Sequence, residues 1–169
     1  MNILTERLEI RTYTPEDLPK LHRLLSDAET MRFWPAPFTT EQSEGWLKRS
    51  LANYSQGYGR MGMFTRKGGE FVGDVGIMTL EVDDMTENDL GYIVHASHWG
   101  KGYGFEAATA VLEYGFQTLG LERICANMPT DHVASRRVAE KLGMTLEKQF
   151  LNKRNRNLPT CLYARRRAK

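Results

Sequence analysis

The sequence lacks the features that mark membrane, secreted and metal-binding proteins. Its 169 residues include only two cysteines, Cys125 and Cys161, and their spacing matches no metal-ligand motif. No run approaches the roughly 20 apolar residues that cross a bilayer. The N-terminus, MNILTERLEIR, lacks the basic and apolar regions of a signal peptide. We therefore expect no metal, two reduced core thiols, no membrane partner and a cytoplasmic setting.

Internal repeats, low-complexity segments and long linkers are also missing, so residues 1–169 are expected to form a single domain. Charge is distributed unevenly along it. Residues 151–169 carry seven Lys and Arg and no acidic residue, so the rest of the chain is acidic. This basic segment is either a solvated end or a surface for an anionic partner.

The conventional phosphate-binding patterns are missing from the chain's glycine cluster, HWGKGYGFEAATAVLEYGF (98–116). A Walker loop needs Lys followed by Ser or Thr, but Gly102 follows Lys101. A Rossmann fingerprint needs G-x-G-x-x-G in the first strand-to-helix turn, whereas G-x-G-x-G stands here late in the chain. The catalytic companions of a kinase glycine loop are absent.

The glycine cluster nevertheless has the properties of an anion site. Its glycines directly precede an apolar-periodic run, and backbone N–H groups at a glycine-rich helix entrance form a cradle that the helix dipole makes positive. Lys101 adds a full positive charge. A phosphate or pyrophosphate is the expected guest.

Periodicity and turn residues predict alternating strands and helices. Strands are expected at 8–13, 60–66, 70–82, 88–97, 121–128, 145–151 and 160–166, and helices at 14–27, 40–56, 102–119 and 132–143. The strands at 88–97 and 121–128 are joined by a helix, so they should be parallel, while those at 60–66 and 70–82 should form a hairpin. A mixed α/β sheet flanked by helices follows.

Five stretches in order resemble one family: TERLEIR, MRFWPAPFT, LGYIV, WGKGYGFEAA and ASRRVAEKLGM. The sequence looks like a GNAT superfamily N-acetyltransferase of the RimJ/RimL-like branch, over nearly the whole chain. The resemblance implies a mostly antiparallel central sheet of about seven strands (α/β or α+β class) with a splayed central pair and four helices. It also implies acetyl-CoA as cofactor.

The same resemblance assigns residues to acetyl-CoA. The pyrophosphate motif maps onto Trp99, Gly100, Lys101, Gly102, Tyr103 and Gly104, with Trp99 in place of the family's Gln or Arg. Ile93 and Val94 would offer backbone groups to the pantetheine arm, and an N–H near Val94 would stabilise the oxyanion.

A second motif of the family implies further contacts to the coenzyme. His132 stands where the family has a pantetheine-binding Asn, and Ser135 would meet the departing sulfur. Arg136 and Arg137 would face the phosphates. The competing interpretation of Ser135 is a first-turn serine bonded to the backbone.

Attack on acetyl-CoA requires a neutral amine. Deprotonation at pH 7 costs about 4.6 kcal/mol for a lysine amine but only about 1–1.4 kcal/mol for an α-amine. Asp89 is our candidate catalytic base, and the other candidates are Asp74, Glu81, His95 and His98. Asn127 could orient the acceptor, and Trp34 and Phe38 could form its wall or belong to the core.

The sequence is therefore interpreted as an enzyme that transfers acetyl from acetyl-CoA to a primary amine, either a protein N-terminus or a small molecule, by direct attack in a ternary complex. One alternative is a non-catalytic CoA-binding regulatory module of the same fold. Another is an RNA or ribosome binder that uses the basic segment, which the lack of an aromatic-basic surface disfavours. The family often dimerises, and the sequence leaves both a monomer and a homodimer open.

Overall fold

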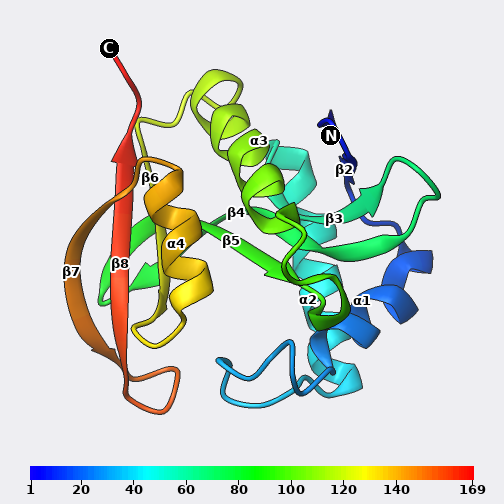
Figure 1. Cartoon of the computed structure of the whole chain (residues 1–169), viewed down its shortest axis with the longest axis horizontal. Helices are drawn as coiled ribbons and strands as arrows, with labels where there is room; N and C mark the ends of the chain where they lie inside the picture. Colours follow the sequence, from blue (N-terminus) through cyan, green and yellow to red (C-terminus); the bar gives the residue numbers. More distant parts are fainter.

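The computed structural model describes residues 1–169 and contains one eight-stranded sheet (Figure 1). The strands stand in the order β1-β2-β3-β4-β5-β6-β8-β7, and every neighbouring pair is antiparallel except β5 and β6. The strands are β1 (Asn2–Leu4), β2 (Leu8–Arg11), β3 (Gly59–Thr65), β4 (Phe71–Val82), β5 (Met85–Val94), β6 (Arg123–Pro129), β7 (Thr145–Asn152) and β8 (Leu158–Arg166).

Four α-helices cover the two faces of this sheet. They are α1 (Leu18–Leu25), α2 (Thr40–Asn53), α3 (Tyr103–Gln117) and α4 (Val133–Lys141). In Figure 1, α3 and α4 lie in front of the sheet and α2 lies behind it. The larger core cluster joins α3 and α4 to the sheet, and a second cluster joins α1 and α2 to the opposite face. Each face of the sheet therefore has its own apolar core.

The predicted fold class is confirmed, with one strand more than expected. Three residues form β1, which pairs with β2 at the sheet edge, and so short a strand has no readable alternation. The predicted strand at 88–97 starts earlier, at Met85. Asp83 and Asp84 form the tight turn before it, with φ values of 47° and 63°. Aspartate tolerates this left-handed conformation, so the turn needs no glycine.

The sheet splays between β5 and β6. These two parallel strands share a single register pair, Asp89 with Cys125. Beyond it β6 continues along β8, whereas β5 continues along β4. The C-terminal half of β5 therefore has a free edge in the middle of the sheet. None of the helices is long and apolar enough to span a membrane.

Candidate active site

The free edge of β5 exposes the backbone of Val94. Along an antiparallel ladder, hydrogen-bonded residue pairs alternate with non-hydrogen-bonded pairs, here called open pairs, whose backbone groups point away from each other. His95 N donates to Val72 O at 2.9 Å, so the next pair, Val94 with Gly73, is an open one. The N–H and C=O of Val94 consequently point away from β4, toward the gap. The C=O accepts a 2.8 Å hydrogen bond from the indole Nε1 of Trp99, which leaves the N–H facing the gap.

This alternation corrects the expectation for Ile93. Ile93 pairs with Asp74, the position next along the ladder, so its backbone groups point to β4 rather than to the gap. Its side chain is buried in the α1–α2 core cluster. By the same alternation Tyr92, not Ile93, joins Val94 in presenting backbone groups at the free edge. Trp99 uses its N–H within the chain, so it is no direct replacement for a phosphate-binding Gln or Arg.

The glycine loop has the backbone of an anion cradle. Gly100 and Gly102 have φ values of 78° and 80°, and Gly102 is the N-cap of α3. These left-handed angles favour glycine. A Cβ at Gly100 would meet no atom within 4 Å, and one at Gly104 would touch Val94 at 3.4 Å. Lys101 stands between the two left-handed glycines, with its Nζ 3.1 Å from Nδ1 of His98. A pyrophosphate fits this cradle.

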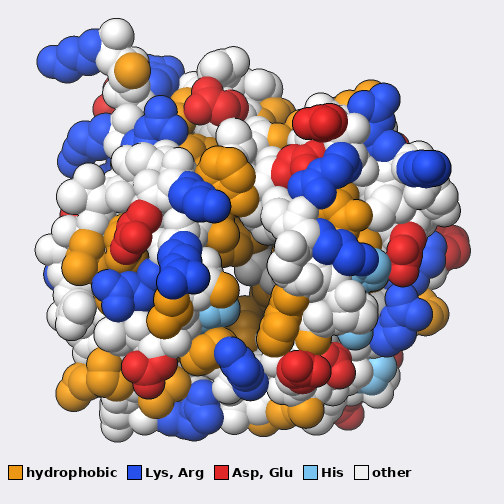
Figure 2. All heavy atoms as spheres, in the orientation of Figure 1, with side chains coloured by type: hydrophobic (Ala, Val, Ile, Leu, Met, Phe, Trp, Pro, Cys, Tyr) orange, Lys and Arg blue, Asp and Glu red, His pale blue; other side chains and the backbone are white.

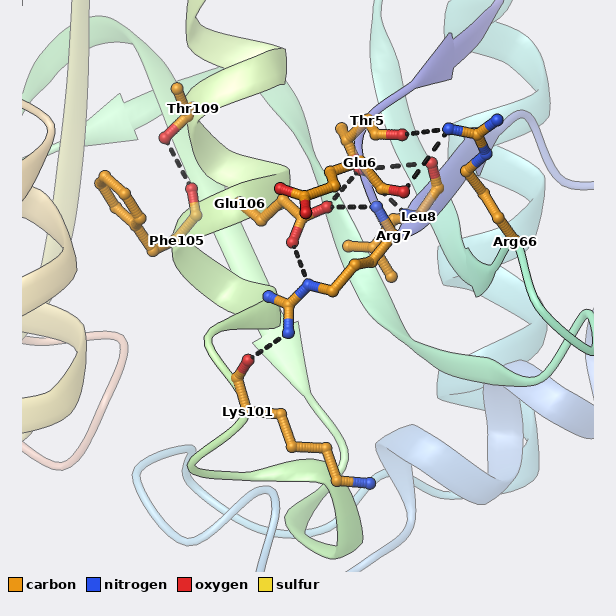
Figure 3. Close-up of polar contacts among 9 residues, drawn as sticks. All are labelled: Thr5, Glu6, Arg7, Leu8, Arg66, Lys101, Phe105, Glu106 and Thr109. Atoms are coloured by element: carbon orange, nitrogen blue, oxygen red, sulfur yellow. Dashed lines mark hydrogen bonds and ion pairs between the residues drawn. The ribbon is translucent and has the colours of Figure 1, made fainter.

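Residues of the N-terminal segment bond both the glycine loop and the first turn of α3, and we call this set of contacts the clamp (Figure 3). Arg7 donates to Glu106 Oε2 at 2.6 Å and to the carbonyl oxygen of Lys101 at 2.7 Å. Thr5 Oγ1 donates to Glu106 Oε1, also at 2.6 Å. Burial raises the pKa of Glu106, but hydrogen bonds from Thr5 and Arg7 outweigh it, so the net pKa is lowered. The carboxylate therefore stays ionised, and the positive charge of Arg7 balances it next to the loop.

Helix α4 contributes a further cationic stripe. Lys141 lies over the ring of Phe105, 5.6 Å from its centroid, in the first turn of α3. Arg137 stands one turn earlier on the same face of α4 and is exposed. Arg136 instead bonds Tyr163 and the carbonyl of Thr130. Figure 2 shows a hollow between the α3 side and the α4 side, with hydrophobic side chains in it and Lys and Arg around it.

The start of α4 faces β5 across this hollow. The hydroxyl of Tyr92 donates to the carbonyl of Ser135 at 2.8 Å, and Ser135 Oγ donates to the Tyr92 oxygen at 3.3 Å. His132 caps α4 through Nδ1 and stacks on Phe33, with ring centroids 4.1 Å apart. Burial, with a smaller effect of Arg32, lowers the pKa of His132 to about 4, so its ring is neutral at pH 7.

A cavity of about 780 Å³ opens at the splay and is lined from both faces of the sheet. Asp89, Ile93, Asn127, Trp34 and Phe38 line it on the α1–α2 side, and Tyr92, His132 and Ser135 line it on the α4 side. Trp34, Phe38 and Trp46 pack edge to face, with centroids 5.6 to 5.7 Å apart, so the first two are both cavity wall and core. Asn155, in the β7–β8 turn, closes one side by donating to the Phe33 carbonyl at 2.7 Å.

Asp89 is the acidic group deep in this cavity. Its Oδ1 accepts from Nδ2 of Asn127 at 2.7 Å and from the Asn127 backbone at 3.2 Å, with Cys125 Sγ at 3.8 Å. Oδ2 has no hydrogen-bond partner in the chain. Burial raises the pKa of Asp89 to about 6, against the opposing effects of Asn127 and Arg60. A carboxylate with that pKa and a free oxygen can accept a proton near neutral pH.

The other candidate bases, Asp74, Glu81, His95 and His98, already contact other side chains. Asp74 is fully buried and accepts hydrogen bonds from Tyr13, Trp46 and Arg60. His98 lies 3.2 Å from Glu70, and His95 bonds Ser97. Glu81 lies on the cavity rim, 3.5 Å from Arg154. Only Asp89 combines burial, access to the cavity and an unused oxygen.

Known proteins match this chain in sequence and in fold. Residues 7–145 match the family described as "Acetyltransferase (GNAT) domain". YkkB of Bacillus subtilis is 32% identical over 167 residues, 97% of this chain and 95% of that one. A GNAT-family acetyltransferase from Bacillus anthracis superposes with a TM-score of 0.83 and 27% identity, covering 98% of each chain. RimL, an L7/L12 α-N-protein acetyltransferase solved with coenzyme A, superposes with a TM-score of 0.80 at 18% identity over 99% of this chain and 98% of that one.

The chain therefore belongs to the GNAT acetyltransferase family. It is an enzyme that uses acetyl-CoA as acetyl donor and an amine as acceptor, the general reaction of that family.

Three elements of the site escaped sequence reasoning. Tyr92 could have been found from strand alternation, because it shares a face with Val94. The contacts of Arg7 with Glu106 cross 99 positions, and no local pattern reveals them. Arg60 lines the cavity because of the way β3, β4 and β5 are paired, which the sequence of one strand does not show.

Proposed function

We propose that the acceptor is a weakly basic α-amine, of a protein N-terminus or a small molecule, and that Asp89 is the catalytic base. The unused Oδ2 of Asp89 carries this proposal, because it is the available proton acceptor in the cavity. A pKa of about 6 matches an α-amine, which is already partly neutral at pH 7, better than a lysine amine.

The proton follows a short route. The amine enters from the aromatic wall of Trp34 and Phe38, and Asp89 Oδ2 takes its proton as the new N–C bond forms. Asn127 fixes the orientation of the carboxylate through Oδ1, which keeps Oδ2 turned to the cavity. The base thereby stays clear of the α3–α4 face, where the coenzyme is expected.

The α3–α4 face would hold the donor. When bound, acetyl-CoA supplies an acetyl thioester. We propose that the N–H of Val94 polarises its carbonyl oxygen, and that Ser135, positioned by Tyr92, donates a hydrogen bond to the leaving sulfur. Gly100, Lys101, Gly102, Tyr103, Gly104, Arg137 and His132 would bind the pyrophosphate and pantetheine, with Trp99 holding the strand end in place.

We also propose a family branch, a cellular compartment and an oligomeric state for this protein. The fold shared with RimL supports the RimJ/RimL-like branch, and the two buried free thiols of Cys125 and Cys161 support a cytoplasmic setting. We propose that residues 1–169 work as one acyltransferase unit, as a homodimer that light scattering would detect. Nucleic acid is not part of the proposed function.

An acceptor screen tests the proposal. The protein is incubated with acetyl-CoA and a panel of amines graded in pKa, from amino-acid amides and short peptides to lysine side-chain analogues and polyamines, and CoA release is followed. We expect the α-amines to be acetylated with the highest kcat/KM at pH 7. Preference for polyamines, or CoA binding without turnover on any amine, would contradict the proposal, and the latter would favour the regulatory module.

A further inference from the structure

The acceptor cavity contains a buried arginine that the proposed mechanism does not use. Arg60, on β3, lines the cavity with Asp89, and its side chain is only 8% exposed. It pairs across the sheet with Gly76, and Gly76 pairs with Gly91. Neither glycine has a side chain on this face of the sheet, so the Arg60 side chain can lie across β4 and β5. A Cβ at Gly91 would come within 1.7 Å of Arg60 Nη1.

The hydrogen bonds of Arg60 are incomplete. Its Nε donates to Asp74, whose second oxygen accepts from Tyr13 at 2.6 Å and from Trp46 at 3.1 Å. Neither Nη1 nor Nη2 has a hydrogen-bond partner. Nη2 is the only such side-chain nitrogen or oxygen that is also shut off from solvent, whereas Nη1, like Asp89 Oδ2, keeps accessible surface. An unsatisfied buried donor is expensive and rare in native proteins. Beside a cavity, it indicates a ligand that brings an acceptor.

The chemistry of that acceptor follows from the neighbouring charges. Asp74 already balances the charge of Arg60. Asp89 stands two positions from Gly91 on the same face, so it supplies a second carboxylate nearby. A ligand carboxylate would crowd a third negative group around one guanidinium. A neutral carbonyl oxygen needs only the free N–H donors, and it brings no charge into the cavity.

We infer that Arg60 binds the amide carbonyl oxygen of the acceptor, while Asp89 takes the proton of the amine on the adjacent carbon. The acceptor class is thus an α-amino amide, the group found in amino-acid amides and at the start of a peptide. This inference rests on the proposed function, since it assigns a second contact to the same acceptor. Arg60 determines specificity, and Gly91 makes room for it.

Two acceptors of similar shape test the inference: alaninamide and 3-methylbutan-2-amine, which lacks the oxygen. The readout is the ratio of their kcat/KM values, compared between proteins so that the intrinsic reactivity of each amine cancels. Gly91→Ala displaces the guanidinium without changing any charge. Arg60→Met with Asp74→Asn removes the donors and keeps the buried cluster neutral. Arg154→Met is the matched control, because Arg154 also lines the cavity but lies in solvent.

We expect the ratio to fall about tenfold or more in both test proteins and to stay constant in Arg154→Met, because a site built to bind an oxygen discriminates against an analogue without one. A purely structural role would lower both activities together and leave the ratio unchanged, which would overturn the inference. So would a wild-type preference for alanine, with its carboxylate, over alaninamide.

Failure of the wild type to acetylate any amine would instead contradict the proposed function. Calorimetric titration of the two amines into the CoA-loaded protein then tests Arg60 independently of turnover. Tighter binding of alaninamide by the wild type but not by Gly91→Ala supports the inference, and equal binding of the two amines by the wild type overturns it.

Discussion

Asn127 donates to Asp89 Oδ1 over 2.7 Å, across the one point where β5 and β6 pair. The hydrogen bond joins the two strands just before they diverge. It also turns the other carboxylate oxygen toward the cavity. Asp89 is therefore held at the point where β5 and β6 separate. This explains how a buried carboxylate lies beside the gap between the two strands.

The raised pKa of Asp89 makes a prediction about stability. Its ordinary pKa, 3.8, applies to the unfolded chain, and the folded value is about 6, so the native state binds the proton more tightly. Asp89 therefore destabilises the fold progressively as pH rises from about 4 to 6, by an amount on the order of 2–3 kcal/mol above that range.

Asp89→Asn removes this titration. We expect the variant to gain unfolding free energy relative to wild type between pH 4.5 and pH 7, as measured by urea denaturation at each pH. Other titrating groups cancel in the difference. A difference that does not vary with pH would show that the Asp89 carboxyl has an ordinary pKa in the fold.

The glycine cradle predicts that Gly102→Val disrupts coenzyme binding. A β-branched residue is strained at a φ of 80°, and correcting that angle moves the N–H groups of the loop. We expect the Kd for acetyl-CoA, measured by calorimetry, to rise about tenfold or more. Gly120→Val is the control, because Gly120 has a φ of 68° but lies at the other end of α3. Equal losses in the two variants would mean that backbone strain alone is responsible.

The clamp behind the loop predicts a separate effect on the coenzyme. Arg7→Met leaves the Glu106 carboxylate uncompensated in the first turn of α3 and frees the carbonyl of Lys101. We expect KM for acetyl-CoA to rise several-fold, with KM for the amine little changed. Arg66→Met is the control, since Arg66 bonds Thr5 O at 2.8 Å in the same segment without touching either group. An equal rise in Arg66→Met would argue against a specific role of Arg7.

The pair formed by Ser135 and Tyr92 predicts a loss in kcat. Ser135→Ala removes the hydroxyl proposed to meet the leaving sulfur, while Tyr92 still bonds the backbone of residue 135. We expect kcat to fall about tenfold, since hydrogen-bonding or acid assistance to a thiol leaving group is worth no more than the low end of general acid catalysis. Binding of acetyl-CoA should change little. Ser55→Ala, at an exposed serine, is the control, and an unchanged kcat in Ser135→Ala would reject the role.

Local patterns predicted the glycine loop and most of the sheet. Gly102 precedes an apolar-periodic run, and the structure makes it the N-cap of α3. Lys67, Gly68 and Gly69, which separate the two predicted strands, likewise predicted the hairpin of β3 and β4. These features depend on neighbours in sequence, whose physics can be read one turn or one strand at a time.

The contacts that complete the site depend instead on register. Ile93 and Val94 are adjacent and both apolar, so only the pairing with β4 decides which one faces the gap. Arg60 meets the cavity because Gly76 and Gly91 fall opposite it on two other strands. A shift of one position in either pairing would reverse these faces, and no pattern within a single strand sets that choice.

The central claim is that Asp89, held at the splay by Asn127, accepts the proton of the amine. The most direct test is the pH dependence of kcat/KM for wild type and Asp89→Asn, with a neutral α-amino amide as acceptor. We expect kcat/KM of the wild type to fall toward acid pH in two steps, one at the pKa of the amine itself and one at an apparent pKa near 6. The variant should keep the first step and lose the second, together with roughly 100-fold or more of its activity. A variant with wild-type activity that keeps both steps would contradict the account.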